Sequence, residues 1–216
     1  MLAISLFKYT FTGTPEAAFN LKDCQEKLFG FYRNEMKVQL LPWDPAHTTD
    51  MDTIFVNLEL MKEEVNPAVT KHIQIDRNED LVTFQKSDGK RVNRVFIQGD
   101  AGSGKSTLLS NVAYKWAKQD SESPLMQFTL VFMIGVHEID KEGNLVDAIF
   151  DQILEEDSVV SREGLTTYIK SHPKEVLYLI DGLDEDNSGV LANDSTEVTQ
   201  VLGNKKLKES CVIVTS

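Results

Sequence analysis

The stretch that decides the fold reads Gly99-Asp100-Ala101-Gly102-Ser103-Gly104-Lys105-Ser106-Thr107. It satisfies the pattern G-x-x-x-x-G-K-[ST] of a phosphate-binding P-loop, between a strand-like run at 95–97 and a helix-like run at 108–113. The glycines let the backbone curl so tightly that successive N–H groups point inward at phosphate oxygens. The helix that begins there adds the positive end of its dipole. All nine residues are therefore predicted to hold the phosphates of a nucleotide.

Three side chains of this loop have separate predicted roles. Lys105 carries a mobile positive charge that can reach the β- and γ-phosphates. Ser106 offers its hydroxyl to a Mg²⁺ ion, and Thr107 is placed to contact the α-phosphate. The sequence thus predicts a nucleotide together with Mg²⁺.

An acidic element follows about 75 residues later. The apolar run 176–180 ends at Asp181, which is typical of a buried parallel strand whose carboxyl end reaches the nucleotide. In P-loop enzymes this aspartate holds the magnesium, so Asp181 joins Ser106 as a predicted metal-binding residue. Asp184 and Glu185 come just past the strand, where a carboxylate can orient the water that attacks the γ-phosphate. Both are predicted catalytic residues, and the sequence leaves open which of them positions the water.

The segment Asp181-Gly182-Leu183-Asp184-Glu185 resembles a motif of the NACHT domain of signal-transducing NTPases. There, a small residue follows the magnesium aspartate, and an apolar residue and two acids come next. Trp116-Ala117, the run 128–134 and the run 211–216 are similar to further pieces of that domain. The lead-in at 41–44 and 54–60 is similar to that of many invertebrate NACHT receptors. The resemblance spans about residues 20 to 216.

Strands that alternate with helices predict a parallel sheet with right-handed crossovers. Together with the resemblance, this implies an α/β fold: a three-layer α/β/α P-loop NTPase preceded by a helical N-terminal extension. The implied divisions are a helical extension and linker at 1–45, a lead-in at 46–92 and the NTPase domain at 93–216. The family pattern continues past Ser216 with a sensor-1 arginine and lid domains, so the domain is expected to be incomplete at its C-terminus.

The same resemblance implies a function. It implies a switch that binds ATP or ADP with Mg²⁺ and hydrolyses ATP slowly to control oligomerisation through NACHT domains. It also implies a role in innate immune or apoptotic signalling, with adaptor or effector partners that the sequence does not identify.

Other P-loop classes fit the sequence less well. A small GTPase would carry glycine at the position of Asp184, and Asn204-Lys205-Lys206-Leu207 ends in the wrong residue for guanine recognition. A transporter ATPase would carry a Leu-Ser-Gly-Gly-Gln signature between the two nucleotide motifs, and none occurs. AAA+ machines share the general plan. An ATPase that remodels a protein substrate therefore stays open as an alternative, as does a nucleotide-holding scaffold without meaningful hydrolysis.

Composition limits the location and the partners. The chain has 216 residues, 41% of them hydrophobic, which suffices for one α/β domain and an extension. No run approaches the length of a membrane span, and the first residues lack the features of a signal peptide. Cys24 and Cys211 match no metal-ligand spacing, so a reduced, cytoplasmic chain without membrane contact is expected.

Negative charge is concentrated late in the chain. The net charge is −12, and residues 138–200 carry 16 acidic and 4 basic side chains, which by themselves give −12. Such a surface repels phosphate backbones, so no direct nucleic-acid binding is expected. A solubilising surface explains the charge most simply, and contact with a basic face of a partner is the sharper alternative.

Several smaller features complete the sequence-based expectations. Thr14-Pro15-Glu16 predicts a helix start, and apolar residues from Leu21 to Tyr32 recur at helical spacing. The run 42–45 predicts a break, 73–84 a short helix with irregular flanks, and 145–154 and 165–169 two further helices. The segment 54–56 is assigned either to an apolar wall for the adenine ring or to core packing.

Overall fold

The computed structural model describes residues 19–35, 38–39, 48–49, 51, 60–66, 69–140, 143–155, 160–186 and 189–216. Three sequence-based expectations lie outside the described residues. They are the helix start at Thr14, the break at 42–45 and the adenine wall at 54–56.

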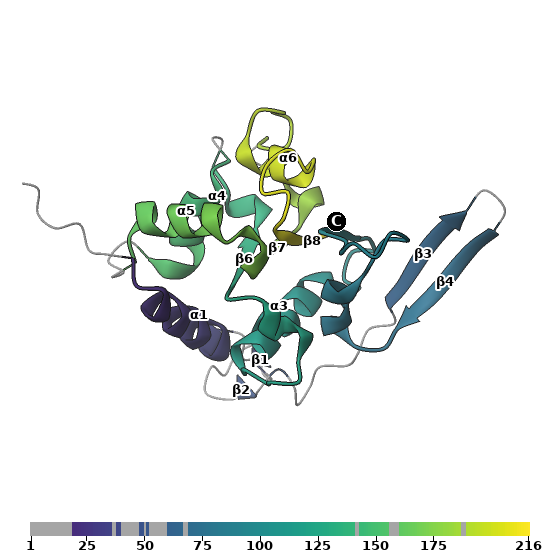
Figure 1. Ribbon diagram of the computed structural model, residues 1–216, viewed down its shortest axis with the longest axis horizontal. Coiled ribbons are helices and arrows are strands. Elements are labelled where there is room, and N and C mark those ends of the chain that lie inside the picture. Colours follow the sequence, from purple (N-terminus) through teal and green to yellow (C-terminus); the bar gives the residue numbers. More distant parts are fainter. Residues whose placement is uncertain are drawn as a thin grey trace, which may run out of the picture.

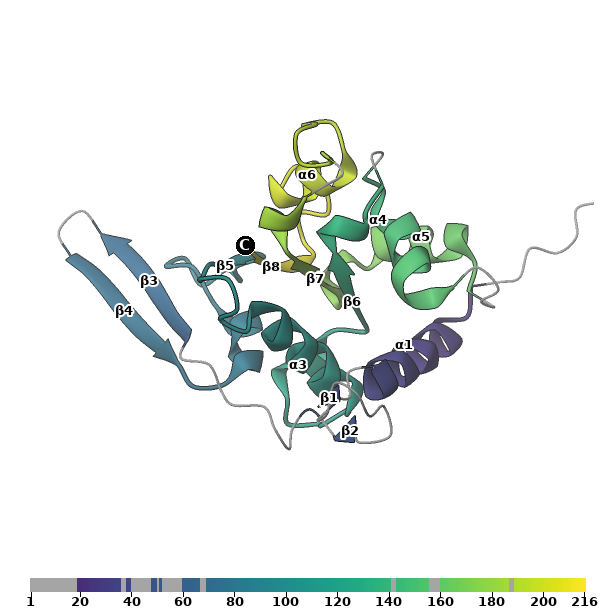
Figure 2. The same cartoon turned by 180° about the vertical axis from the view of Figure 1, so that it is seen from behind.

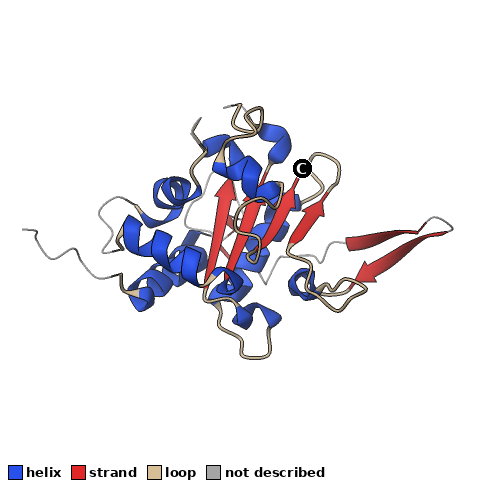
Figure 3. Cartoon of the chain, turned by 45° about the horizontal axis from the view of Figure 1, so that its top comes forward, coloured by secondary structure: helices blue, strands red, loops and turns tan. Residues whose placement is uncertain are grey.

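A four-stranded parallel sheet forms the centre of the protein. Its strands are β5 (Arg94–Ile97), β6 (Leu130–Gly135), β7 (Val176–Asp181) and β8 (Cys211–Thr215), in the spatial order β5-β8-β7-β6. The interior strands β7 and β8 are buried almost throughout, as expected for apolar runs covered on both faces. Figures 1 and 3 show helices on both sides of these strands. The predicted α/β fold with a parallel sheet is confirmed.

Helices connect the strands. Those that lie where the sequence periodicity predicts them are α3 (Lys105–Ala117), α4 (Leu145–Ile149) and α5 (Arg162–Ser171). A further helix, α6 (Glu197–Leu202), has no sequence-based expectation. The helix α4 runs on into a π-helical turn, η4 (Phe150–Leu154), so the predicted helix over 145–154 is present with a change of winding. Short 3-10 turns fill the connections at η2 (Pro124–Gln127), η3 (Val136–Glu138), η5 (Pro173–Glu175) and η6 (Leu183–Glu185).

The N-terminal helix α1 (Leu21–Glu35) packs into the same core as the sheet. Its backbone start is capped by Asn20, whose side-chain oxygen accepts from the amide of Lys22 at 3.1 Å. The rings of Phe29 and Tyr32 lie 4.7 and 6.1 Å from the ring of Trp116 on α3. The predicted amphipathic helix from Leu21 to Tyr32 is thus confirmed, with its apolar face against α3.

At the outer edge of β6, the backbone N–H and C=O groups form hydrogen bonds with side chains rather than with another described strand. The hydroxyl of Tyr32 donates to the carbonyl of Val131 at 2.9 Å and accepts from the amide of Met133 at 3.0 Å. Gln152 bonds both backbone groups of Gly135, at 2.8 and 3.1 Å. Further along, Gln25 donates to the carbonyl of Thr129 at 3.0 Å. These contacts close an edge that would otherwise be open to pairing with another chain.

Removal of the buried Tyr32 hydroxyl is expected to destabilise the protein. In Tyr32→Phe, two backbone groups of β6 lose their partner in a site without solvent, at a cost of about 1 to 3 kcal/mol. Urea unfolding followed by circular dichroism measures the loss. Tyr168→Phe is the matched control, because the hydroxyl of Tyr168 donates to Glu175, which also accepts from Thr129. An equal loss in the two variants would contradict the role of Tyr32 at the β6 edge.

A β-hairpin extends away from the rest of the protein. It consists of β3 (Leu60–Asn66) and β4 (Val69–Ile75), antiparallel with Leu60 opposite Ile75, and Figures 1 and 2 show its projection. The predicted helix over 73–84 is wrong at its start, because 73–75 pair with β3. Its helical part is the 3-10 helix η1 (Asn78–Thr83). A two-residue ladder, β1 (Val38–Gln39) with β2 (Thr48–Thr49), is the other antiparallel pair described.

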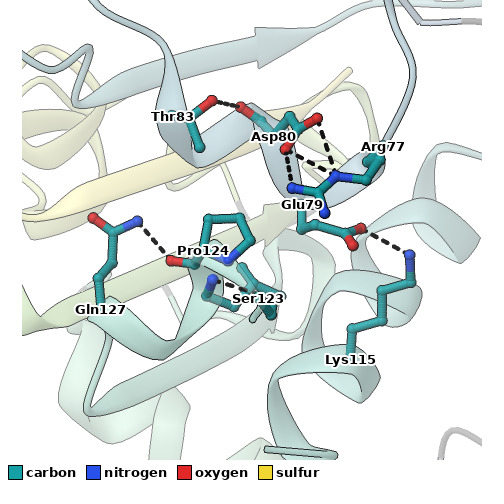
Figure 4. A network of polar contacts seen from close by, with 9 residues as sticks. Arg77, Glu79, Asp80, Thr83, Lys115, Ser123, Pro124 and Gln127 are labelled. Atoms are coloured by element: carbon teal, nitrogen blue, oxygen red, sulfur yellow. Dashed lines mark hydrogen bonds and ion pairs between the residues drawn. The ribbon is translucent and has the colours of Figure 1, made fainter. Parts of the chain in front are cut away.

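Polar contacts fix η1 to the P-loop helix. The ammonium of Lys115 on α3 lies 2.7 Å from the carboxylate of Glu79, and the amide of Asn78 donates to Asn111 at 3.3 Å. Within η1, Arg77 pairs with Asp80 at 2.8 Å. Figure 4 shows the Lys115–Glu79 and Arg77–Asp80 pairs above the neighbouring turn η2. The base of the hairpin is therefore attached to the helix that follows the P-loop.

Arg94 positions the strand β8. Its guanidinium, on β5, donates five hydrogen bonds of 2.7 to 3.2 Å to backbone carbonyls. Four of these carbonyls belong to the segment from α6 to the start of β8, and the acceptors are Asn93, Val201, Lys206, Leu207 and Ser210. The loop before β8 is thereby held against β5, the strand that leads into the P-loop.

Candidate functional site

The P-loop depends on glycine at two positions. Gly102 and Gly104 have φ of 76° and 90°, where a side chain would be strained, and Gly104 caps α3 in the left-handed conformation. At Gly99 a Cβ would lie 2.9 Å from the hydroxyl of Ser103, so that side chain would have to move. The curl of the loop therefore relies on the left-handed backbone of Gly102 and Gly104.

Lys105 lies across its own loop. Its ammonium donates to the carbonyl oxygens of Gly99 at 2.7 Å and Asp100 at 3.1 Å. These contacts hold the positive charge beside the N-terminus of α3, where the backbone amides and the helix dipole also favour an anion.

Asp181 ends β7 and is held by the neighbouring strand. The hydroxyl of Thr215, the last residue of β8, donates to Asp181 Oδ1 at 2.5 Å. The same hydroxyl accepts from the amide of Gly182 at 3.0 Å, and Thr215 is fully buried. Sequence reasoning missed Thr215. The available signal was its position: Thr215 is the polar residue that follows the apolar run 211–214. In a parallel sheet, the carboxyl end of this strand lies at the same edge as Asp181.

The predicted catalytic carboxylates lie on the turn after Asp181. Gly182 has a φ of 75°, and the amide of Glu185 donates to its carbonyl at 3.0 Å, which closes η6. A Cβ on Gly182 would lie 3.2 Å from Glu185 Oε2, so the carboxylate of Glu185 lies against this glycine. Both Asp184 and Glu185 are exposed.

One pocket of about 290 Å³ brings these residues together. Its lining comes from the P-loop, from the ends of β7 and β8 and from η6: Ala101, Gly102, Gly104, Lys105, Ser106, Thr107, Asp181, Gly182, Asp184, Glu185 and Thr215. Every predicted metal-binding and catalytic residue lines it. Of the nine predicted phosphate-binding residues, Gly99, Asp100 and Ser103 do not, and the first two instead accept hydrogen bonds from Lys105. What each residue does in the pocket stays a prediction.

The chemistry of the pocket fits a nucleotide with Mg²⁺. Its cation, helix N-terminus and glycine loop suit phosphates, and the oxygens of Ser106 and Asp181 are ligands that Mg²⁺ prefers. Mg²⁺ at nucleotide sites is commonly held by one or two protein oxygens plus phosphates and waters. The described part of the chain contains no group of three or more His, Cys, Asp or Glu residues arranged to hold a metal by itself.

Other features of the described residues do not extend this site. A second pocket, of about 420 Å³, is lined by five polar residues, two of which, Glu79 and Lys115, pair with each other. Cys24 and Cys211 are free thiols, and burial raises the pKa of Cys24 to about 12, so its thiol is unreactive at neutral pH. Among the helices described, none is both long and apolar enough to cross a membrane.

Comparisons with known proteins agree with this geometry. The family model described as "NACHT domain" matches residues 93–216. The protein named NLR family CARD domain-containing protein 4 from Bos taurus is 25% identical over 197 residues, which is 91% of this chain and 18% of that protein. The Mus musculus protein of the same name is 32% identical over 136 residues, 63% of this chain and 13% of the relative.

A relative with a different name matches the same region. Baculoviral IAP repeat-containing protein 1 from Homo sapiens is 27% identical over 146 residues, which is 67% of this chain and 10% of that protein. The chain thus spans less than a fifth of the length of these curated relatives.

Proposed function

Because the chain belongs to the NACHT domain family, we propose that it is the nucleotide-operated switch of a signalling receptor. In this proposal the pocket binds ATP or ADP with Mg²⁺, and slow hydrolysis of ATP controls oligomerisation through NACHT domains. On the family resemblance, the proposed setting is innate immune or apoptotic signalling in the cytoplasm. The unit that binds the nucleotide is residues 93–216, with 46–92 as its lead-in and 1–45 as an extension.

The observation that carries the proposal is the composition of one pocket. A glycine-rich loop at a helix N-terminus, a lysine and an aspartate at a strand end line the same 290 Å³ space. Each of these parts occurs alone in many proteins. Together they supply what a nucleoside triphosphate with a divalent cation needs: amides and a cation for the phosphates and oxygens for the metal.

In this proposal, the residues of the pocket bind the phosphates, bind Mg²⁺ or orient water according to their position. The nine residues 99–107 bind the phosphates, and Lys105 exchanges its loop carbonyls for phosphate oxygens. Bound Mg²⁺ neutralises phosphate charge, and Ser106 and Asp181 are the residues that hold it. Asp184 and Glu185 line the same pocket from η6, where a carboxylate orients the attacking water.

Calorimetric titration of the chain with ATP, ADP and GTP, each with and without Mg²⁺, tests this proposal. We expect ATP and ADP to bind and GTP to bind at least tenfold more weakly. Steady-state turnover separates the switch from the alternative, an AAA+-like remodelling ATPase, because a remodelling enzyme must cycle continuously. Turnover well above one per minute would favour the alternative, and absence of adenine nucleotide binding would contradict both.

A further inference from the structure

We propose that Thr215 is a positioning residue of the nucleotide site, which fixes Asp181 and the catalytic turn in register with the P-loop. This inference rests on the proposed function, because it assigns Thr215 to the Mg²⁺ response of that site.

The strand β8 lies between the two strands that carry the nucleotide motifs. The sheet order places it beside β5, which leads into the P-loop, and beside β7, which ends at Asp181. Thr215 pairs in register with Ile97, and the amide of Ser216 donates to the carbonyl of Ile97 at 3.1 Å. The end of β8 therefore contacts both the strand that leads into the P-loop and the strand that ends at Asp181.

The hydroxyl of Thr215 both donates and accepts a hydrogen bond in this position. It donates its proton to Asp181 Oδ1 at 2.5 Å and accepts from the amide of Gly182 at 3.0 Å. A charge-assisted hydrogen bond of this length orients a carboxylate strongly. Among the described residues no hydrogen bond reaches the other oxygen, Asp181 Oδ2. Thr215 thus fixes one carboxylate oxygen of a residue that lines the pocket, and leaves the second oxygen available for a ligand.

The hydrogen bond that the hydroxyl of Thr215 accepts holds the start of the turn η6 in place. Gly182 is the left-handed residue from which η6 starts, and its amide is held by Thr215. Since Asp184 and Glu185 follow within three residues, a shift of Gly182 moves both carboxylates. Partners of this kind, behind a metal ligand, typically contribute 10- to 100-fold to metal affinity.

The experiment compares Thr215→Val, Thr215→Ser and the unchanged chain. ATP affinity is measured by calorimetry over a Mg²⁺ titration and in excess chelator. Mg²⁺ is expected to increase the affinity for ATP. In Thr215→Val, we expect the Mg²⁺ concentration that gives half of this increase to rise about 10- to 100-fold. Its ATP affinity without Mg²⁺ should stay within about twofold, because Thr215 makes no bond to the P-loop side chains. Thr215→Ser keeps the hydroxyl and should restore the response.

A matched control separates positioning from general stability. Thr196 is also buried, and its hydroxyl caps α6 by accepting from the amide of Thr199 at 3.3 Å. Thr196→Val removes a buried hydroxyl that does not line the pocket and should leave the Mg²⁺ titration unchanged. If Thr215→Val does not fold cooperatively, Thr215→Ala replaces it, since it puts no methyl group in the place of the hydroxyl.

The outcomes are distinguishable. An unchanged Mg²⁺ titration in the folded Thr215→Val protein overturns the inference and leaves the proposed function intact. Equal losses of ATP affinity with and without Mg²⁺ also overturn it, because the hydroxyl would then only support the fold. Failure of the unchanged chain to bind ATP in a Mg²⁺-dependent way instead overturns the proposed function.

Discussion

Lys105→Ala is expected to lose ATP binding by at least 100-fold. The ammonium is the main countercharge that the pocket offers to the β- and γ-phosphates, and charge-assisted hydrogen bonds contribute about 1.5 to 3 kcal/mol each. Two such bonds correspond to about 3 kcal/mol or more, which exceeds a factor of 100 in affinity. Calorimetric titration with Mg²⁺ and ATP measures the loss.

The fold should survive this substitution. The backbone contacts that shape the loop, such as the bond of 3.1 Å from the amide of Ser103 to Asp100, do not involve the lysine side chain. An unfolding temperature close to that of the unchanged chain would establish this. Lys174→Ala, which removes an exposed lysine at the opposite end of β7, is the control and should bind ATP normally. Unchanged affinity in Lys105→Ala would contradict the assignment of the P-loop.

Substitutions at the three carboxylates are expected to separate binding from hydrolysis. Asp181→Asn should weaken Mg²⁺-dependent ATP binding, because a neutral amide is a poor ligand for a hard cation. Asp184→Asn and Glu185→Gln should bind ATP nearly normally and hydrolyse it about 100-fold or more slowly, as expected when a group that positions or deprotonates water is lost. Single-turnover hydrolysis at saturating Mg²⁺ and ATP measures the second effect.

The two catalytic carboxylates can be ranked by the same assay. Glu185 lies against Gly182 at the base of the turn, and Asp184 lines the same pocket. If Glu185→Gln hydrolyses ATP normally while Asp184→Asn is inactive, the water is positioned by Asp184 alone. Normal hydrolysis in both variants would show that neither carboxylate has the predicted role.

The parts of the site that sequence predicted are those specified locally. The P-loop needs its glycines, its lysine and the following helix, all within one short stretch. Asp181 ends an apolar run, and parallel strands present their carboxyl ends at one edge. Their meeting in one pocket with Asp184 and Glu185 therefore follows from two local patterns and the parallel fold class.

The parts that sequence missed depend on contacts between distant segments. Thr215 gains its place only because β8 lies between β5 and β7, an order that no local pattern encodes. The closure of the β6 edge needs Tyr32 from a helix about 100 residues earlier in the chain. The helix predicted over 73–84 fails at 73–75 because pairing with β3 prevails over local preference.

The central claim is that the P-loop and the ends of β7 and β8 form one nucleotide site, and hydrogen exchange with Mg²⁺ and ATP tests it most directly. The account predicts slower amide exchange at 99–107 and at 182–185 when the nucleotide is bound, with little change in the hairpin at 60–75. Lys105→Ala should abolish both effects together. Unchanged exchange at 99–107 under saturating Mg²⁺ and ATP, or protection confined to another part of the chain, would contradict it.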